Sequence, residues 1–110
     1  MPERRQSERF ELFAQVELRN ESQVETFVTI NISAGGLLLR NDRNITFAVG
    51  AQIRVGFDVP DLAPAFAIDA TVVRVIGPTA KPGLLAAMWT SSDPAATAAL
   101  GQILWNLRKS

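Results

Sequence analysis

The sequence predicts an all-β domain, built as an antiparallel barrel or sandwich, with one helix at its C-terminal end. Three observations support this fold class. Apolar and polar residues alternate in several successive runs, turn-forming residues separate these runs at short intervals, and the pattern changes to a helical spacing only after Asp93. Six or so short strands in such an order are typical of antiparallel barrels and sandwiches.

The first half of the chain contains three of the predicted strands. Residues 1–9 are polar and charged without a period, so we interpret them as a flexible, exposed N-terminal arm. The first strand alternates from Phe10 to Leu18. After a turn, the alternation resumes at Val24, Thr26, Val28, Ile30 and Ile32. A break at 33–36 leads into a short strand over 36–40.

Three further strands are predicted in the second half. Alternating apolar residues run over 53–59, and two prolines end that run. A longer run covers 66–76, in which we interpret Arg74 as a solvent-facing strand residue. A loop rich in glycine and proline then separates it from a last apolar strand over 84–89. Trp89 ends that strand and is assigned to the core.

A C-terminal helix is predicted over 93–108. Asp93 is suited to cap the free N–H groups of the first turn, and Pro94 fits the first helical position. Ala96, Leu100, Ile103, Leu104 and Leu107 follow at helical spacing. This apolar face is expected to pack on the barrel and cover an open end, and the alternative is a surface for a partner protein. The organisation is therefore a single domain over 1–110: arm 1–9, β-barrel 10–90 and helix 93–108.

Composition excludes several classes of function. The 110 residues contain no histidine and no cysteine, which removes the usual general base, the thiol nucleophile and the commonest metal ligands, so we expect no enzyme, no metal site and no cofactor. Eleven basic and eleven acidic residues cancel, which argues against long nucleic acid and against a small OB-like barrel on single strands. No apolar run is long enough for a membrane span, and a cytoplasmic location is expected.

Two short motifs are candidates for a binding site. Arg5-x-x-x-Arg9 lies on the arm, and Asn31-x-Ser33-x-x-Gly36 lies at the turn one hairpin later. Taken singly, each has an ordinary explanation, because charged residues solvate a terminus and Asn, Ser and Gly favour turns. Taken together, two guanidinium forks facing a polar turn can enclose a small, planar, anionic ligand.

In this order and spacing the two motifs resemble the PilZ domain, a bacterial receptor module for the second messenger cyclic di-GMP. The resemblance covers nearly the whole chain and implies a six-stranded antiparallel barrel with a C-terminal helix. It also implies a non-catalytic receptor that binds cyclic di-GMP, orders its arm and presents a changed surface to a protein partner. Motility and exopolysaccharide regulation are among the outputs that such domains serve.

The resemblance implies a role for each motif residue. Arg5 and Arg9 would contact a guanine edge and a phosphate, with Arg4 as an additional candidate, while Asn31 and Ser33 would hydrogen-bond a guanine and Gly36 would allow its close approach. Many members have Asp at the position of Asn31, and the amide lacks its charge. The last strand also departs from the family pattern at Ala86. The alternative is a PilZ-like adaptor that binds protein and no nucleotide.

Overall fold

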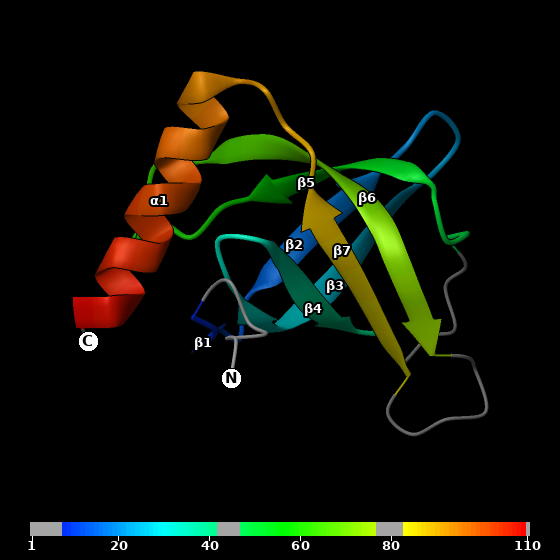
Figure 1. The fold of residues 1–110 in the computed structure, drawn as a ribbon, viewed down its shortest axis with the longest axis horizontal. Helices are drawn as coiled ribbons and strands as arrows, with labels where there is room; N and C mark the ends of the chain where they lie inside the picture. The colour runs from blue at the N-terminus through cyan, green and yellow to red at the C-terminus, as the bar shows by residue number, and fades with distance from the viewer. Residues whose placement is uncertain (1–7, 42–46, 77–82, 110) are drawn as a thin grey trace, which may run out of the picture.

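Six antiparallel strands close into a barrel in the computed structural model, which describes residues 8–41, 47–76 and 83–109 (Figure 1). The elements are β1 (Phe10–Glu11), β2 (Gln15–Arg19), β3 (Val24–Ile32), β4 (Gly36–Arg40), β5 (Gln52–Phe57), β6 (Phe66–Ile76), β7 (Leu84–Trp89) and α1 (Pro94–Lys109). Around the barrel the order is β3-β2-β5-β6-β7-β4, and a β3–β4 pairing closes it. The predicted barrel with a C-terminal helix is confirmed.

The core lies inside the barrel and is formed by the alternate positions of the strands. On β5, for example, Ile53, Val55 and Phe57 are all buried, as their alternation predicts. Phe57 stacks on Phe66 with ring centroids 5.0 Å apart and meets Trp89 at 6.1 Å. These aromatic contacts fill the barrel toward the end where the helix packs.

The inward face predicted for β3 is wrong over the first part of the strand. Phe27 and Thr29 are buried, whereas Val24, Thr26 and Val28 are exposed. The register with β4 then shifts between Thr29 and Asn31, which leaves Ile30 as the extra residue of a β-bulge. The bulge reverses the alternation, so Ile32 returns to the core and Asn31 turns outward.

The single strand predicted over 10–18 is also divided. Residues of β1 pair with the end of β3, those of β2 pair with its earlier part, and three residues between them form no strand. Thr29 joins this interruption to β3, because its buried hydroxyl donates to the carbonyl oxygen of Leu12 and accepts from the Ala14 N–H at 2.9 Å. Thr29 thus satisfies backbone groups of the segment between β1 and β2 that would otherwise lack a partner.

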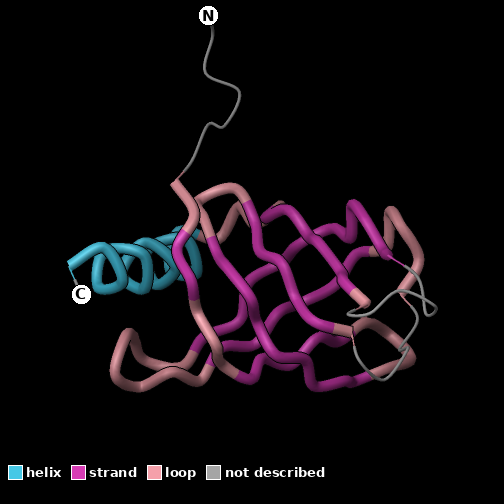
Figure 2. Tube along the Cα trace, turned by 90° about the horizontal axis from the view of Figure 1, so that it is seen from below, coloured by secondary structure: helices cyan, strands magenta, loops and turns pink. Residues whose placement is uncertain are grey.

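The helix lies beside one end of the barrel (Figures 1 and 2). It buries Ala96, Leu100 and Ile103, which are three of the apolar positions that the helical spacing predicts. Near its C-terminal end, the Asn106 side-chain amide donates to the Leu62 carbonyl oxygen at 2.7 Å, which ties the helix to the loop between β5 and β6. Within the described residues, no helix is long and apolar enough to cross a membrane.

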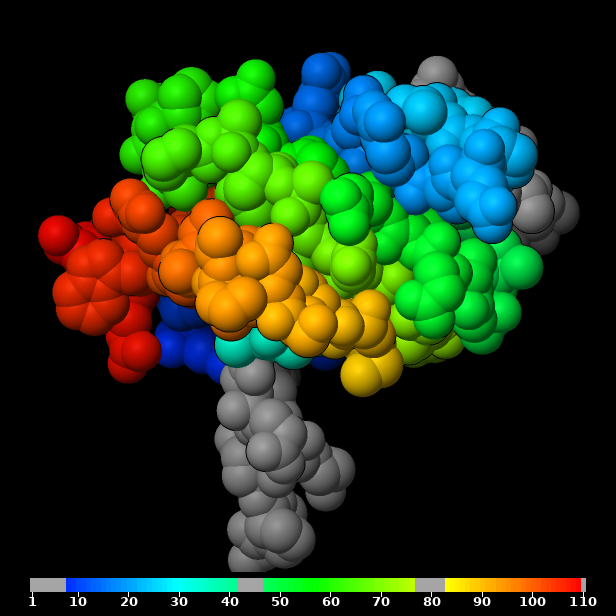
Figure 3. Space-filling view, turned by 90° about the horizontal axis from the view of Figure 1, so that it is seen from above, coloured from blue at the N-terminus to red at the C-terminus, as the bar shows by residue number. Residues whose placement is uncertain are grey.

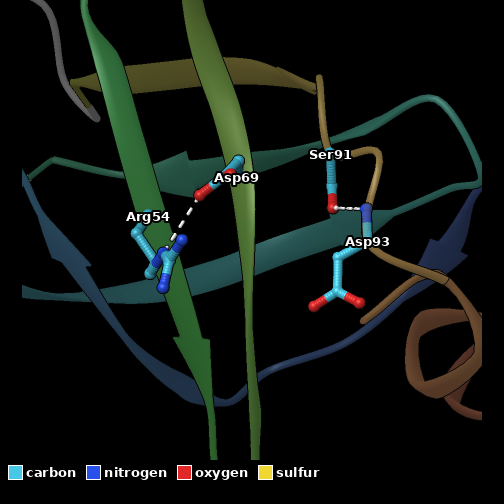
Figure 4. A network of polar contacts seen from close by, with 4 residues as sticks. All are labelled: Arg54, Asp69, Ser91 and Asp93. Atoms are coloured by element: carbon cyan, nitrogen blue, oxygen red, sulfur yellow. Dashed lines mark hydrogen bonds and ion pairs between the residues drawn. The ribbon is translucent and has the colours of Figure 1, made fainter. Parts of the chain in front are cut away.

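Asp93 caps this helix as predicted, and the cap can be tested. Its carboxylate accepts from the Ala95 N–H at 3.0 Å, and its own N–H donates to the Ser91 hydroxyl at 3.0 Å (Figure 4). We expect Asp93→Ala to lower the free energy of unfolding by about 1 kcal/mol, the usual contribution of such a cap. Urea denaturation measures this. Ser92→Ala, an exposed neighbour, is the control and is expected to leave stability within about 0.5 kcal/mol.

Candidate functional site

Four of the predicted site residues gather around the turn that joins β3 to β4. Arg9 directly precedes β1, whose pairing aligns Phe10 with Ile32 and Glu11 with Asn31. Continued by one residue, this register sets Arg9 opposite Ser33. Arg9 and the polar turn therefore lie on adjacent chain segments, although they are 22 or more positions apart in the sequence. Arg4 and Arg5 lie outside the described residues.

Ser33 holds the turn closed through its side chain. Its hydroxyl oxygen accepts from the N–H groups of Gly35 at 3.1 Å and Gly36 at 3.3 Å, and its own N–H donates to the Gly36 carbonyl oxygen at 2.8 Å. A serine hydroxyl has two lone pairs and one proton. Both lone pairs are thus occupied, while the proton spans a weak 3.5 Å to the Gly36 carbonyl oxygen. Toward a ligand, this side chain can act as a donor.

Trp89 supports the turn from the neighbouring strand, a role that sequence reasoning did not assign to it. Its indole N–H donates to the Ser33 carbonyl oxygen at 2.9 Å, and its backbone N–H donates to the Gly35 carbonyl oxygen at 3.0 Å. The ring also contacts Phe57 in the core. The sequence offers no local signal of this contact, because Trp89 and Ser33 lie 56 positions apart. In Figure 3 the turn, in teal, emerges between the dark blue N-terminal residues and the yellow-to-orange end of β7.

Asn31 and Gly36 differ in whether the fold itself explains the residue at that position. Asn31 is half-buried on the outer face, and its side-chain amide forms no hydrogen bond within the described part of the chain. A Cβ on Gly36, by contrast, would lie 2.1 Å from the Ala87 carbonyl oxygen. The close approach of β4 to β7 is therefore a sufficient reason for glycine at this position. The ligand contact predicted for Gly36 stays a prediction.

The outer wall beside the turn carries apolar side chains that are paired across neighbouring strands. Leu38 pairs with Asn31 on one side and with Ala86 on the other, so the three side chains form one row across the outer surface. Leu38 and Ala86 are both half-buried. The small side chain of Ala86 projects little from the outer surface at this part of the wall. A flat ring could lie on such a row beside the polar turn.

The electrostatics of the site depend on few groups. Arg9 is exposed and forms no ion pair with any residue in the ranges that the structure describes, while its exposed neighbours Glu8 and Glu11 are acidic. Within the described residues, Arg9 therefore offers an unpaired positive charge beside the turn. Among residues 8–41, 47–76 and 83–109, no cluster of side chains is placed to hold a metal ion.

Two open depressions on the described surface lie elsewhere. The larger, of about 820 Å³, is lined by residues of the β2–β3 turn and of β5, including Arg19 and Arg54. The other, of about 340 Å³, lies between β2 and β5 beside Gly56. Neither is lined by Arg9, Asn31, Ser33 or Gly36. The described residues of the candidate site therefore form a patch on the outer wall that is not part of either depression.

Comparisons with solved structures find the same fold over almost the whole chain. The inhibitor of motility MotI/DgrA from Bacillus subtilis is 18% identical with a TM-score of 0.75, and the match covers 99% of this chain but 53% of that one. The PilZ domain of YcgR from Escherichia coli, solved with c-di-GMP, is 16% identical with a TM-score of 0.74, covering 97% of this chain and 93% of that one.

A third structure, the MrkH–c-di-GMP complex of K. pneumonia, is 20% identical with a TM-score of 0.74, covering 99% of this chain and 57% of that one. The chain thus spans about half the length of the motility inhibitor and of MrkH. A search of curated protein sequences finds no match. A family model described as the PilZ domain matches residues 3–104, which include both arginines of the arm motif and the complete turn motif. The chain therefore belongs to the PilZ domain family.

Proposed function

We propose that this protein is a non-catalytic receptor for cyclic di-GMP that acts in the cytoplasm. The observation that carries the proposal is the β1–β3 register, which aligns Phe10 and Glu11, the two residues after Arg9, with Ile32 and Asn31 at the start of the polar turn. Two structures similar in fold, those of YcgR and MrkH, contain c-di-GMP, which supports this choice of ligand. Arg5, four residues before Arg9, would supply the second guanidinium from the arm.

The donors and acceptors at the wall match the parts of this ligand. The Hoogsteen edge of guanine offers two acceptors, N7 and O6, which fit one guanidinium fork, and a second arginine pairs with a phosphate. Arg5 and Arg9 share these two roles, with Arg4 in support. Ser33 donates its hydroxyl proton to a ligand acceptor, because its lone pairs are used in the turn. The Asn31 amide oxygen accepts from guanine N–H groups.

Isothermal titration with cyclic di-GMP tests the proposal. We expect binding to wild type, and we expect Arg5→Ala and Arg9→Ala each to weaken it by about 5- to 150-fold, the factor that corresponds to the roughly 1–3 kcal/mol of a bidentate arginine–base pair. Arg40→Ala, at the far end of β4 from the turn, is the control and is expected to bind as wild type does. A folded wild type that releases no heat with cyclic di-GMP would contradict the proposal.

Ligand binding is proposed to act on a partner through the arm. A segment that folds over its ligand pays an ordering cost on binding and changes the surface it presents. The free and bound protein then differ near the β3–β4 turn and β1, next to which α1 packs. Hydrogen exchange of residues 1–11 with and without cyclic di-GMP measures this ordering.

The second candidate function is an adaptor that binds a protein without nucleotide. One observation favours it: Trp105 on α1 is 60% exposed, with the Lys109 ammonium 5.9 Å from its ring centroid. Exposed tryptophan is common at protein interfaces. A partner that is retained by the Arg5→Ala/Arg9→Ala double variant, and whose binding is indifferent to cyclic di-GMP, would favour the adaptor over the receptor.

A further inference from the structure

A second β-bulge lies on the same wall as the candidate site. The β6–β7 register shifts between Val72 and Arg74, which leaves Val73 as the extra residue, 45% exposed. Val72 is fully buried, and in a regular strand Arg74, two residues later, would share its inward face. The bulge instead turns Arg74 outward, and Val75 packs against the core in its place.

The two bulges bring two polar side chains into one row. Asn31 pairs with Leu38, Leu38 pairs with Ala86, and Ala86 pairs with Arg74. Residues paired directly across neighbouring strands point to the same face of a sheet. At about 4.8 Å per strand, Asn31 and Arg74 stand about 14 Å apart along the sheet, with two apolar residues between them. Each bulge thus redirects a side chain that would otherwise point into the core.

Arg74 is exposed, and no partner among the described residues explains its outward position. Within residues 8–41, 47–76 and 83–109 its guanidinium forms no ion pair and no hydrogen bond. Arg54, an exposed arginine on β5, is different, because its Nε donates to the carboxylate of Asp69 on β6 at 3.0 Å (Figure 4). A bulge next to a binding surface that re-aims an unpaired arginine is consistent with recognition of an anionic or acceptor-rich group.

We propose that Arg74 is a further ligand-binding arginine, which reads the guanine of cyclic di-GMP that lies farther from the arm. This inference rests on the proposed receptor function. The ligand has two guanines, and the arm arginines with Asn31 and Ser33 account for only one of them. Leu38 and Ala86 provide an apolar floor between the two ends of the row, and the fork of Arg74 matches the N7 and O6 acceptors of the second base.

Calorimetric titration of four variants with cyclic di-GMP tests this assignment. Arg74→Ala is expected to weaken binding by about 5- to 150-fold, and Arg74→Lys to recover only part of the loss, because an ammonium keeps the charge without the planar fork. Ala86→Phe, which raises the floor on an outward-facing position, is expected to weaken binding by at least tenfold. Arg54→Ala is the matched control, since it removes an exposed strand arginine outside the row, and its affinity is expected to stay within twofold of wild type.

The outcomes separate this inference from the function on which it rests. If wild type binds and Arg74→Ala binds equally well, the role of Arg74 is overturned and the receptor function stands. If wild type fails to bind, both are overturned. The side-chain Nε–H resonance of Arg74 in the wild-type protein gives a readout that needs no variant. We expect it to shift on addition of cyclic di-GMP, and a resonance unmoved at saturation would overturn the assignment.

Discussion

A Gly36→Ala variant is expected to lose about 3 kcal/mol or more of its free energy of unfolding. The added Cβ would lie 2.1 Å from the Ala87 carbonyl oxygen and 3.1 Å from the Met88 Cα. Both neighbours are backbone atoms of β7, so they can move only if the β4–β7 ladder opens. Overpacking with side-chain neighbours costs about 1–3 kcal/mol, and a rigid backbone neighbour places this variant at or above that range. Urea denaturation followed by circular dichroism measures the loss.

Gly101→Ala is the matched control for this prediction. Gly101 lies within α1, and a Cβ built there meets nothing within 4 Å. We expect the change to stabilise the protein by about 0.5–1 kcal/mol, because alanine is the better helix former. Near-wild-type stability of Gly36→Ala would contradict the close approach of β4 to β7. Loss of cyclic di-GMP binding in that variant would not by itself identify a ligand contact, since the turn that carries Ser33 depends on the same ladder.

The sequence predicts the fold because its strongest signals are local and repeated. On β5 and along the first part of β6, each inward position is apolar and each turn has its own breaker, so alternation alone assigns the buried face. The helix is equally well marked, since Asp93 and Pro94 begin it and Ala96, Leu100 and Ile103 form its buried face. The choice between barrel and sandwich rests on the family resemblance, because it depends on the β3–β4 pairing that closes the barrel.

The two bulges could not be predicted in this way. A bulge is defined by the partner strand, and a single sequence contains no record of which residues face each other. On β3 the error has a clear physical reason. Both alternating sets contain apolar residues, but Phe27 offers a larger surface to bury than Val28 and contacts Phe47 at 6.0 Å between ring centroids. The larger side chain is therefore buried, and the bulge at Ile30 restores the phase at Ile32.

The candidate site could be predicted only in part, because the sequence gives residue types and their order but not the pairing of strands. Residue types and order suffice to propose Arg9, Asn31 and Ser33, and the β1–β3 register adds their proximity. The contact between Trp89 and the turn joins residues 56 positions apart, so no local pattern reveals it. The outward direction of Arg74 depends on the extra residue in β6. The residues of the site could thus be predicted from the sequence, whereas the contacts that support them could not.

Thr29→Val is expected to lower the free energy of unfolding by about 2–4 kcal/mol, although the two side chains have nearly the same shape. The Thr29 hydroxyl is fully buried, donates to the Leu12 carbonyl oxygen and accepts from the Ala14 N–H at 2.9 Å. Valine leaves both backbone groups without a partner, and an unpaired polar group away from water costs about 1–3 kcal/mol. The lost hydrogen bonds loosen the segment that links β1 to β2, and this loosening is expected to change the position of Arg9.

Two measurements separate this effect from general destabilisation. In native-state hydrogen exchange, the Ala14 amide is expected to exchange faster in Thr29→Val than global unfolding alone accounts for, because it loses its acceptor. Thr71→Val is the control: Thr71 is a half-exposed β6 residue whose hydroxyl makes no hydrogen bond within the described residues, so its stability is expected to change by less than about 0.5 kcal/mol. If Thr29→Val binds cyclic di-GMP as tightly as wild type while the Ala14 amide exchanges freely, Arg9 does not need the β1–β3 register, and the observation that carries the receptor proposal loses its force.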